Sequence, residues 1–132
     1  MNRRLFLWAP VVAYMALIFW LSSLANPPQP PGPLSILSDK WLHGMLYAGL
    51  SVLVVRALAG RLLGAVSVRV AALAIAVSVL YGVTDEIHQY FVPPRQSDVL
   101  DVVADFLGAT LAALALYAVS RFRRASMSGS AL

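Results

Sequence analysis

The sequence predicts an all-α integral membrane protein, a four-transmembrane-helix bundle with both termini cytoplasmic. Two observations predict this fold. The 132 residues are 60% hydrophobic and only 12% charged, whereas a soluble domain usually has about 45–50% apolar and about 25% charged residues. The charges also punctuate long apolar runs instead of forming a patch among polar residues, which favours a membrane protein over a soluble or nucleic-acid-binding one.

The first apolar run spans about residues 5–25 and carries no charge. A helix needs about 20 residues to cross the hydrocarbon of a bilayer, so this run is long enough. A cleaved signal peptide is the alternative interpretation, because Arg3 and Arg4 precede the run and Ser23-Leu24-Ala25 resembles a cleavage site. The run exceeds the usual signal-peptide core of about 7–15 residues, which favours a retained span.

Three more spans are expected, at about residues 40–59, 67–90 and 99–120. The four spans together use most of the chain, so little of it is left for a separate soluble domain. Residues 1–132 are therefore expected to form a single membrane domain.

The segments outside the spans are short and differ in composition. Residues 26–38 hold five prolines and are expected to be extended and non-helical, because proline lacks the amide donor that a helix needs. Residues 60–66 are expected to form a short basic turn, and residues 91–98 hold two further prolines. Residues 121–132 are basic and rich in serine, and we expect them to form a disordered cytoplasmic tail.

The charged residues separate onto two sides when the four spans are threaded through a bilayer. Lys and Arg prefer the cytoplasmic ends of spans. One side carries eight arginines and no acid, whereas the other carries two basic and six acidic residues, a net side-chain charge of −4. This separation predicts that both termini are cytoplasmic. The outer side holds Lys40, Arg95, Asp39, Asp85, Glu86, Asp98, Asp101 and Asp105, and the inner side holds Arg3, Arg4, Arg56, Arg61, Arg69, Arg121, Arg123 and Arg124.

Three acids from three different spans are expected at one depth. Asp85 and Asp105 each lie sixteen residues from an inner arginine, roughly 24 Å along a helix that rises about 1.5 Å per residue. Asp39 lies seventeen residues from Arg56, roughly 26 Å. In a hydrocarbon layer about 30 Å thick, all three would lie near the outer boundary. Ionisable groups at this depth usually face a bundle interior or a watery cleft and mark a functional site.

Helical spacing places further polar residues on the same helix faces as these three acids. Asp39, His43 and Tyr47 follow one another at intervals of four, so they line one face of the second span. In the third span, Gln89 follows Asp85 by four residues and Glu86 by three. The stripe that opens the fourth span comprises Asp98, Asp101, Asp105 and Gly108.

Several of these residues have purely structural alternatives. Asp98 can cap the fourth span by accepting backbone N–H bonds, with Asp101 as the acid of a capping box. Asp39 can cap the second span in the same way. Lys40 can serve as an interfacial anchor, and His88 is interpreted as an interfacial residue.

Two sequence elements carry a family resemblance. Ser38-Asp39-Lys40-Trp41-Leu42-His43, followed by Tyr47, resembles the DKxxHxxxY element of VanZ-like membrane proteins. Residues 85–91, followed by Arg95, Asp101, Asp105 and Gly108, resemble that family's DExxQxF…R…D…(N/D)xxG element, in which Asn often stands at the position of Asp105. The resemblance covers about residues 38–112. It implies a multi-pass protein of the bacterial inner membrane with an envelope role, because the member that names the family is linked to resistance to the glycopeptide teicoplanin.

Three classes of function remain open. The first is a binding module, in which carboxylates hold the hydroxyls or amines of a cell-wall lipid intermediate, another amphiphile or a glycopeptide, while Arg95 or Lys40 holds phosphate. The second is an enzyme that modifies a lipid-linked substrate by acid–base chemistry, although no GxSxG or HExxH motif is present. The third is a small transporter or an assembly partner. Small residues at 108–113 would let another helix approach closely and would suit a homo-oligomer.

The candidate site therefore combines catalytic and ligand-binding positions. An enzyme would use Asp85, Glu86 and His43 for acid–base chemistry. No cofactor is firmly implied, but these acids have the oxygen ligands that a divalent cation takes. Membrane lipids are the expected partners, and nucleic acid is not, because the basic residues flank spans and form no basic-aromatic stripe. The ligand-binding positions are Asp39, Lys40, Tyr47, Gln89, Arg95, Asp101 and Asp105.

Overall fold

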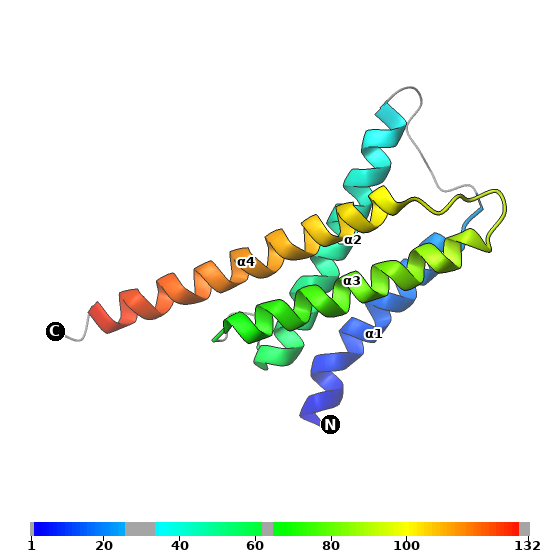
Figure 1. Cartoon of the computed structure of the whole chain (residues 1–132). Helices are drawn as coiled ribbons and strands as arrows, with labels where there is room; N and C mark the ends of the chain where they lie inside the picture. The colour runs from blue at the N-terminus through cyan, green and yellow to red at the C-terminus, as the bar shows by residue number, and fades with distance from the viewer. Residues whose placement is uncertain (1, 26–33, 62–64, 130–132) are drawn as a thin grey trace.

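The computed structural model describes residues 2–25, 34–61 and 65–129, and within these ranges all regular secondary structure is α-helical. The helices are α1 (Arg3–Ser22), α2 (Leu34–Ala59), α3 (Val68–Tyr90) and α4 (Val99–Gly129), as drawn in Figure 1. Each is long and apolar enough to cross a membrane. The predicted all-α fold with four membrane spans is thus confirmed, while the cytoplasmic placement of the termini stays a prediction.

Helix α2 lies at the centre of the bundle and packs against the other three helices. Helix α3 also contacts α1 and α4, whereas α1 and α4 share no contact within the described ranges. Tyr47, Leu50 and Val54 of α2 are fully buried, so one continuous face of this helix forms the middle of the core. Of the face predicted from the sequence, His43 and Tyr47 belong to this buried face, whereas Asp39, nearer the upper end of α2 in Figure 1, is only partly buried.

The contact between α2 and α4 depends on Gly108, which lies against the backbone of Gly44. A Cβ atom on Gly108 would overlap the backbone of Gly44, so only glycine allows the two helices to approach this closely. Ala109 and Ala113 of the same small-residue face are completely buried. This face is therefore covered by α2 of the same chain. It no longer supports the predicted homo-oligomer, which stays a prediction.

Two boundaries differ from the sequence-based expectations. Helix α2 begins at Leu34 and not near residue 40, so the part of the proline-rich segment after residue 33 is helical; residues 26–33 lie outside the described ranges. All five prolines of that segment precede Leu34, so nothing interrupts the helix after this point. Asp39 consequently lies inside the helix, and the alternative that it caps the span is wrong.

Helix α4 continues to Gly129, so the expectation of a disordered segment from residue 121 is also wrong for the described residues. Residues 121–128 contain neither glycine nor proline, and most of them are good helix formers, so the helix has no reason to stop at the membrane boundary. Residues 130–132 lie outside the described ranges.

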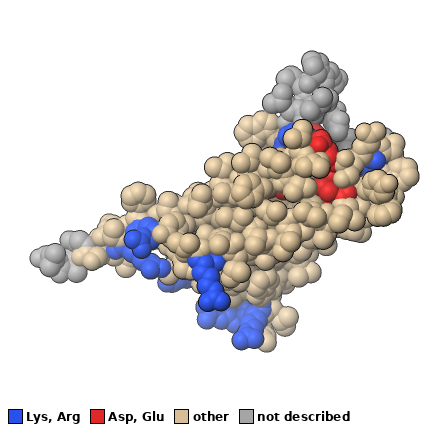
Figure 2. Space-filling view, in the orientation of Figure 1, with Lys and Arg blue, Asp and Glu red and all other residues tan. Residues whose placement is uncertain are grey.

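The charges gather at opposite ends of the bundle (Figure 2). Acidic side chains lie where α2 and α4 begin and α3 ends, which we call the site end. The other end carries exposed arginines, including Arg4, Arg69 and Arg121. The separation of charge predicted from the sequence is therefore present in the fold.

Candidate functional site

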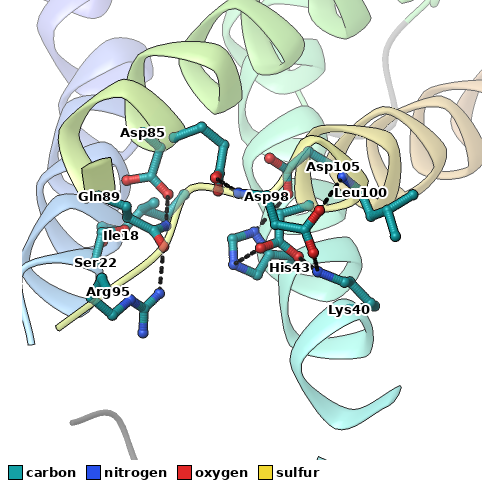
Figure 3. Close-up of polar contacts among 12 residues, drawn as sticks. Ile18, Ser22, Lys40, His43, Asp85, Gln89, Arg95, Asp98, Leu100 and Asp105 are labelled. Carbon is teal, nitrogen blue, oxygen red and sulfur yellow. Dashed lines mark hydrogen bonds and ion pairs between the residues drawn. The ribbon is translucent and has the colours of Figure 1, made fainter. Parts of the chain in front are cut away.

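Three helices supply the polar side chains of the site end (Figure 3). The upper turns of α2 carry residues 39–47, the last turns of α3 carry residues 85–89, and the first turns of α4 carry residues 98–105. Asp85, Glu86, Asp101 and Asp105 are buried, with exposed fractions of 5% or less. Acids from two different helices are thus removed from solvent at one level of the bundle.

His43 is held by a carboxylate of α4. Its Nδ1 lies 3.1 Å from Oδ1 of Asp105, and its Nε2 lies 3.9 Å from Oδ2 of Asp101. Asp105 fits here because α3 has no side chain at Gly82, where a Cβ atom would lie 2.5 Å from Asp105 Oδ2. The Tyr47 ring stacks parallel to the imidazole, with 6.5 Å between ring centroids. The ring of His43 is therefore fixed by contacts with α2 and α4.

Lys40 forms ion pairs with two acids of α4. Its Nζ lies 2.5 Å from Oδ2 of Asp98 and also contacts Oδ1 of the buried Asp101. The Lys40 ammonium beside it, together with the backbone N–H of Leu100, holds the pKa of Asp98 below its usual value. Because its ammonium is already paired, Lys40 ties α2 to α4, and its predicted part in ligand binding stays a prediction.

A chain of hydrogen bonds runs from the loop after α3 to a buried carboxylate. Arg95 donates from Nη2 to Oε1 of Gln89 over 2.6 Å, and Gln89 donates from Nε2 to Oδ2 of Asp85 over 3.2 Å. The sequence predicts Arg95 as a ligand-binding residue that holds phosphate. Among the described residues it makes no ion pair with an acid, because its guanidinium lies against the Gln89 amide instead.

Glu86 caps a helix other than its own. Its Oε2 accepts the backbone N–H of Asp98 over 2.8 Å, and the Asp98 side chain accepts the N–H of Leu100 over 2.8 Å. The prediction that Asp98 caps the fourth span is confirmed. The companion idea of a capping box completed by Asp101 is wrong, because Glu86 takes that N–H and the Asp101 carboxylate pairs with Lys40.

Four buried oxygen atoms of the site have no hydrogen-bond partner among the described residues. They are the Tyr47 hydroxyl, Asp85 Oδ1, Glu86 Oε1 and Asp105 Oδ2. Asp85 and Glu86 also have no basic side chain within ion-pair distance in the described part of the chain. A buried carboxylate without a partner is costly, so this arrangement indicates that a proton, a water or a ligand completes the site.

A cavity of about 70 Å³ lies beside these groups. It has room for a few water molecules or a small polar group. Helix α1 forms part of its wall through Ile18, Leu21 and Ser22. The sequence did not assign α1 to the site, because two apolar residues and one serine within a span give no chemical signal. The polar lining is Ser22, Asp39, His43, Tyr47, Asp85 and Arg95, and the apolar lining is Ile18, Leu21, Leu42 and Leu46.

A second, open hollow of about 310 Å³ lies between α2 and α4. Lys40 stands at one end of it and Leu111 at the other, with Trp41, Gly44 and Leu107 between them. The hollow is almost entirely apolar, so it suits a hydrocarbon chain better than a polar ligand.

All ten residues predicted for the site lie at the site end. Direct contacts join Lys40 to Asp101, His43 to Asp105, Gln89 to Asp85, and Arg95 to Gln89. Glu86 joins the group through Asp98, and Asp39 and Tyr47 through the cavity wall. His88 lies outside the site: it contacts Ser23 of the described segment after α1 at 3.0 Å and packs on Phe19.

Four membrane-spanning helices with a buried acidic site at one end define a multi-pass membrane protein. The sequence model of the VanZ/LLP1 family matches residues 6–121, so the chain belongs to this family, and the resemblance seen in the sequence is confirmed. Comparison with the curated proteins and with the solved structures finds no significant match.

Proposed function

We propose that this protein binds the polar headgroup of a cell-envelope lipid at the outer face of the bacterial cytoplasmic membrane. The observation that carries the proposal is the cavity beside His43, whose wall combines two acids and an arginine with the apolar Ile18, Leu21 and Leu42. Polar and apolar groups around one small space match the boundary between the headgroup and the acyl chains of a lipid.

The charges of the site favour a particular headgroup chemistry. Asp39 and Asp85 would accept hydrogen bonds from an amine or from sugar hydroxyls, while Arg95 at the loop would bind a phosphate oxygen. The site end carries a net side-chain charge of −4, so a headgroup with an amine is preferred to one with only anionic groups. The apolar hollow between α2 and α4 offers a place for an acyl chain.

Binding of defined lipids to the purified full chain tests this proposal. Native mass spectrometry would compare phosphatidylethanolamine, phosphatidylglycerol with the same acyl chains, and a lipid-linked cell-wall intermediate. We expect the amine-bearing or sugar-bearing lipids to be retained in preference, with loss of this preference in Asp85→Asn and Arg95→Gln. Arg69→Gln, an exposed arginine at the opposite end, is the matched control. Equal retention of all lipids by the wild type would contradict the proposal.

Shielding or relocating such a lipid would lower the access of a glycopeptide to it, which gives a route to resistance. Growth in teicoplanin of cells that lack the protein, complemented with the wild type or with Asp85→Asn, tests this part. Resistance restored to the same level by both versions would separate the resistance role from the site.

A second candidate function is acid–base catalysis on a lipid-linked substrate, and one observation favours it. His43 is held at Nδ1 by Asp105, as in a general base whose second nitrogen faces a substrate, and buried acids lie near it. Lipid mass spectrometry of cells with and without the protein is the test. A lipid species that changes with wild type but not with His43→Gln would favour catalysis, and an unchanged profile would favour binding alone.

A further inference from the structure

We propose that His43, Asp85 and Glu86 bind a divalent transition-metal ion between α2 and α3. One ring nitrogen of His43 and one carboxylate oxygen from each acid lie within 4.8 Å of one another, and all three residues are buried. Three ligand atoms at such separations can reach a shared ion after small adjustments, because metal–ligand distances of about 2.0–2.2 Å are typical for imidazole and carboxylate groups.

Each of the three side chains is already held at one end by a neighbour. His43 Nδ1 lies 3.1 Å from Asp105 Oδ1, and with the proton on Nδ1 donated to this carboxylate, Nε2 keeps a lone pair for a metal ion. Asp85 accepts from Gln89 through Oδ2, and Glu86 accepts the Asp98 N–H through Oε2. Supporting contacts of this kind orient the ligands in metal sites, and a carboxylate bonded to the other ring nitrogen of a ligating histidine is one of them.

The other oxygen of each acid lacks a partner. Asp85 Oδ1 and Glu86 Oε1 are both buried and make no hydrogen bond among the described residues. Neither acid has a lysine or arginine within ion-pair distance in the described ranges, since Lys40 pairs with Asp98 and Asp101. A bound dication would supply the missing positive charge and satisfy both orphan oxygens at once.

The donor set indicates which ions fit. One imidazole nitrogen with two carboxylates suits Zn²⁺ or Mn²⁺, whereas Mg²⁺ and Ca²⁺ prefer oxygen ligands alone. The cavity of about 70 Å³, which His43 and Asp85 line, leaves room for water in the remaining coordination positions. The site uses only protein groups and needs no lipid, so it stands independently of the proposed function.

Metal titration of the full chain without a polyhistidine tag tests the site. The protein, purified in detergent and stripped with a chelator, would be dialysed against Zn²⁺ or Mn²⁺, and bound metal measured by mass spectrometry. We expect one equivalent of Zn²⁺ per chain, tighter binding of Zn²⁺ than of Mn²⁺, and no competition from equimolar Mg²⁺ or Ca²⁺. His43→Gln, Asp85→Asn and Glu86→Gln should each weaken Zn²⁺ binding by at least about 100-fold, and Asp105→Asn by about 10–100-fold.

Matched controls and a folding measurement complete the design. His88→Gln removes a histidine at the same end of the bundle but outside the site and should leave Zn²⁺ binding unchanged. Asp85→Asn and Glu86→Gln remove an unpaired buried charge, so both should fold, and Zn²⁺ should raise the melting temperature of the wild type but not of these variants. Because no lipid is present, loss of metal binding and loss of headgroup selectivity are measured separately.

Two results would overturn the assignment. The first is a wild type that retains no Zn²⁺ or Mn²⁺, or ligand variants that bind as the wild type does. The second is loss of binding in Asp39→Asn and Asp101→Asn with full binding in Asp85→Asn and Glu86→Gln. That pattern would move the ion to the other group of nearby ligands, Asp39, His43 and Asp101.

Discussion

The two ends of the bundle treat their charges in opposite ways. At the basic end, Arg4, Arg69 and Arg121 extend into the surroundings and are exposed. At the site end, Asp101 and Asp105 are 3% and 0% exposed, and each lies against a basic or histidine side chain of α2. Exposed charges interact weakly and can be exchanged one at a time, whereas buried acids depend on specific partners. At the basic end, only the total positive charge therefore matters. At the site end, the position of each acid relative to its partner matters as well.

The largest expected effect concerns the side of the membrane on which each end lies. The chain has no cysteine, so single cysteines can be introduced at the exposed Gln96 and Ser126 without a background signal. A membrane-impermeant thiol reagent added to intact cells should label Gln96→Cys but not Ser126→Cys. Ser126→Cys should be labelled only after the cells are permeabilised. The reverse pattern would place the site end in the cytoplasm and contradict the orientation on which the proposed function depends.

The next largest effect is expected at the contact of α2 with α4. Gly108→Val places methyl groups against the backbone of Gly44, which cannot move aside as a side chain would. We expect a loss of at least about 3 kcal/mol in the free energy of unfolding, measured by SDS titration and circular dichroism. Ala115→Val, at an exposed position of the same helix, is the control and should change stability little. Comparable losses in both variants would argue against this contact as the support of the site end.

Loss of a single basic residue distinguishes the two ends directly. Lys40→Met leaves the buried Asp101 without its cation and should lower the free energy of unfolding by about 2–3 kcal/mol, somewhat less than for a fully buried pair. Arg69→Met at the basic end should change it by no more than about 0.5 kcal/mol. Adding Asp101→Asn to Lys40→Met should recover part of the loss, and no recovery would mean that Lys40 acts through its packing.

A smaller effect is expected where Glu86 caps α4. Glu86→Leu removes the acceptor of the Asp98 N–H and should cost about 1 kcal/mol, with faster hydrogen exchange at residues 98–101. Glu86→Gln keeps an oxygen acceptor and removes an unpaired buried charge, so in metal-free protein it should be at least as stable as the wild type. Equal exchange rates in the two variants would rule out the capping contact.

The smallest effect is a pH dependence. The pKa of Asp98 is lowered in the folded protein by the Lys40 ammonium, so its contribution to stability is complete above the ordinary carboxyl pKa of about 3.9 and is lost as the pH falls through the lower folded value. The difference in unfolding free energy between the wild type and Asp98→Asn should therefore be constant near neutral pH and shrink only below about pH 4. A difference that shrinks at higher pH would assign the stabilisation to another group.

Much of the fold follows from local patterns in the sequence. Four long apolar runs give the four helices, and intervals of four place His43 and Tyr47 on one face. His43 and Tyr47 also belong to the sequence element that resembles the VanZ-like family. These features depend on hydropathy and on the helical repeat, and both can be read from a short stretch of sequence without knowledge of the fold.

The remaining features depend on contacts between distant segments. The bond from Glu86 to the Asp98 amide, the approach of Gly44 to Gly108 and the α1 wall of the cavity all join residues that no local pattern relates. The start of α2 and the end of α4 differ from the sequence-based prediction for another reason. Proline and serine content suggested loops there, although no residue from Leu34 to Ser38 or from Arg121 to Ser128 breaks a helix.

The Gln89 side chain gives the link between loop and core a fixed direction. Its oxygen must face a donor and its nitrogen an acceptor, and the guanidinium of Arg95 and the carboxylate of Asp85 meet these two demands in that order. An amide turned end for end would set NH₂ against guanidinium and oxygen against carboxylate. An acid in place of Arg95 would thus reverse the Gln89 amide and turn its oxygen toward the Asp85 carboxylate, which would repel it. The charge of residue 95 in the loop therefore affects a carboxylate about one helical turn deeper in the bundle.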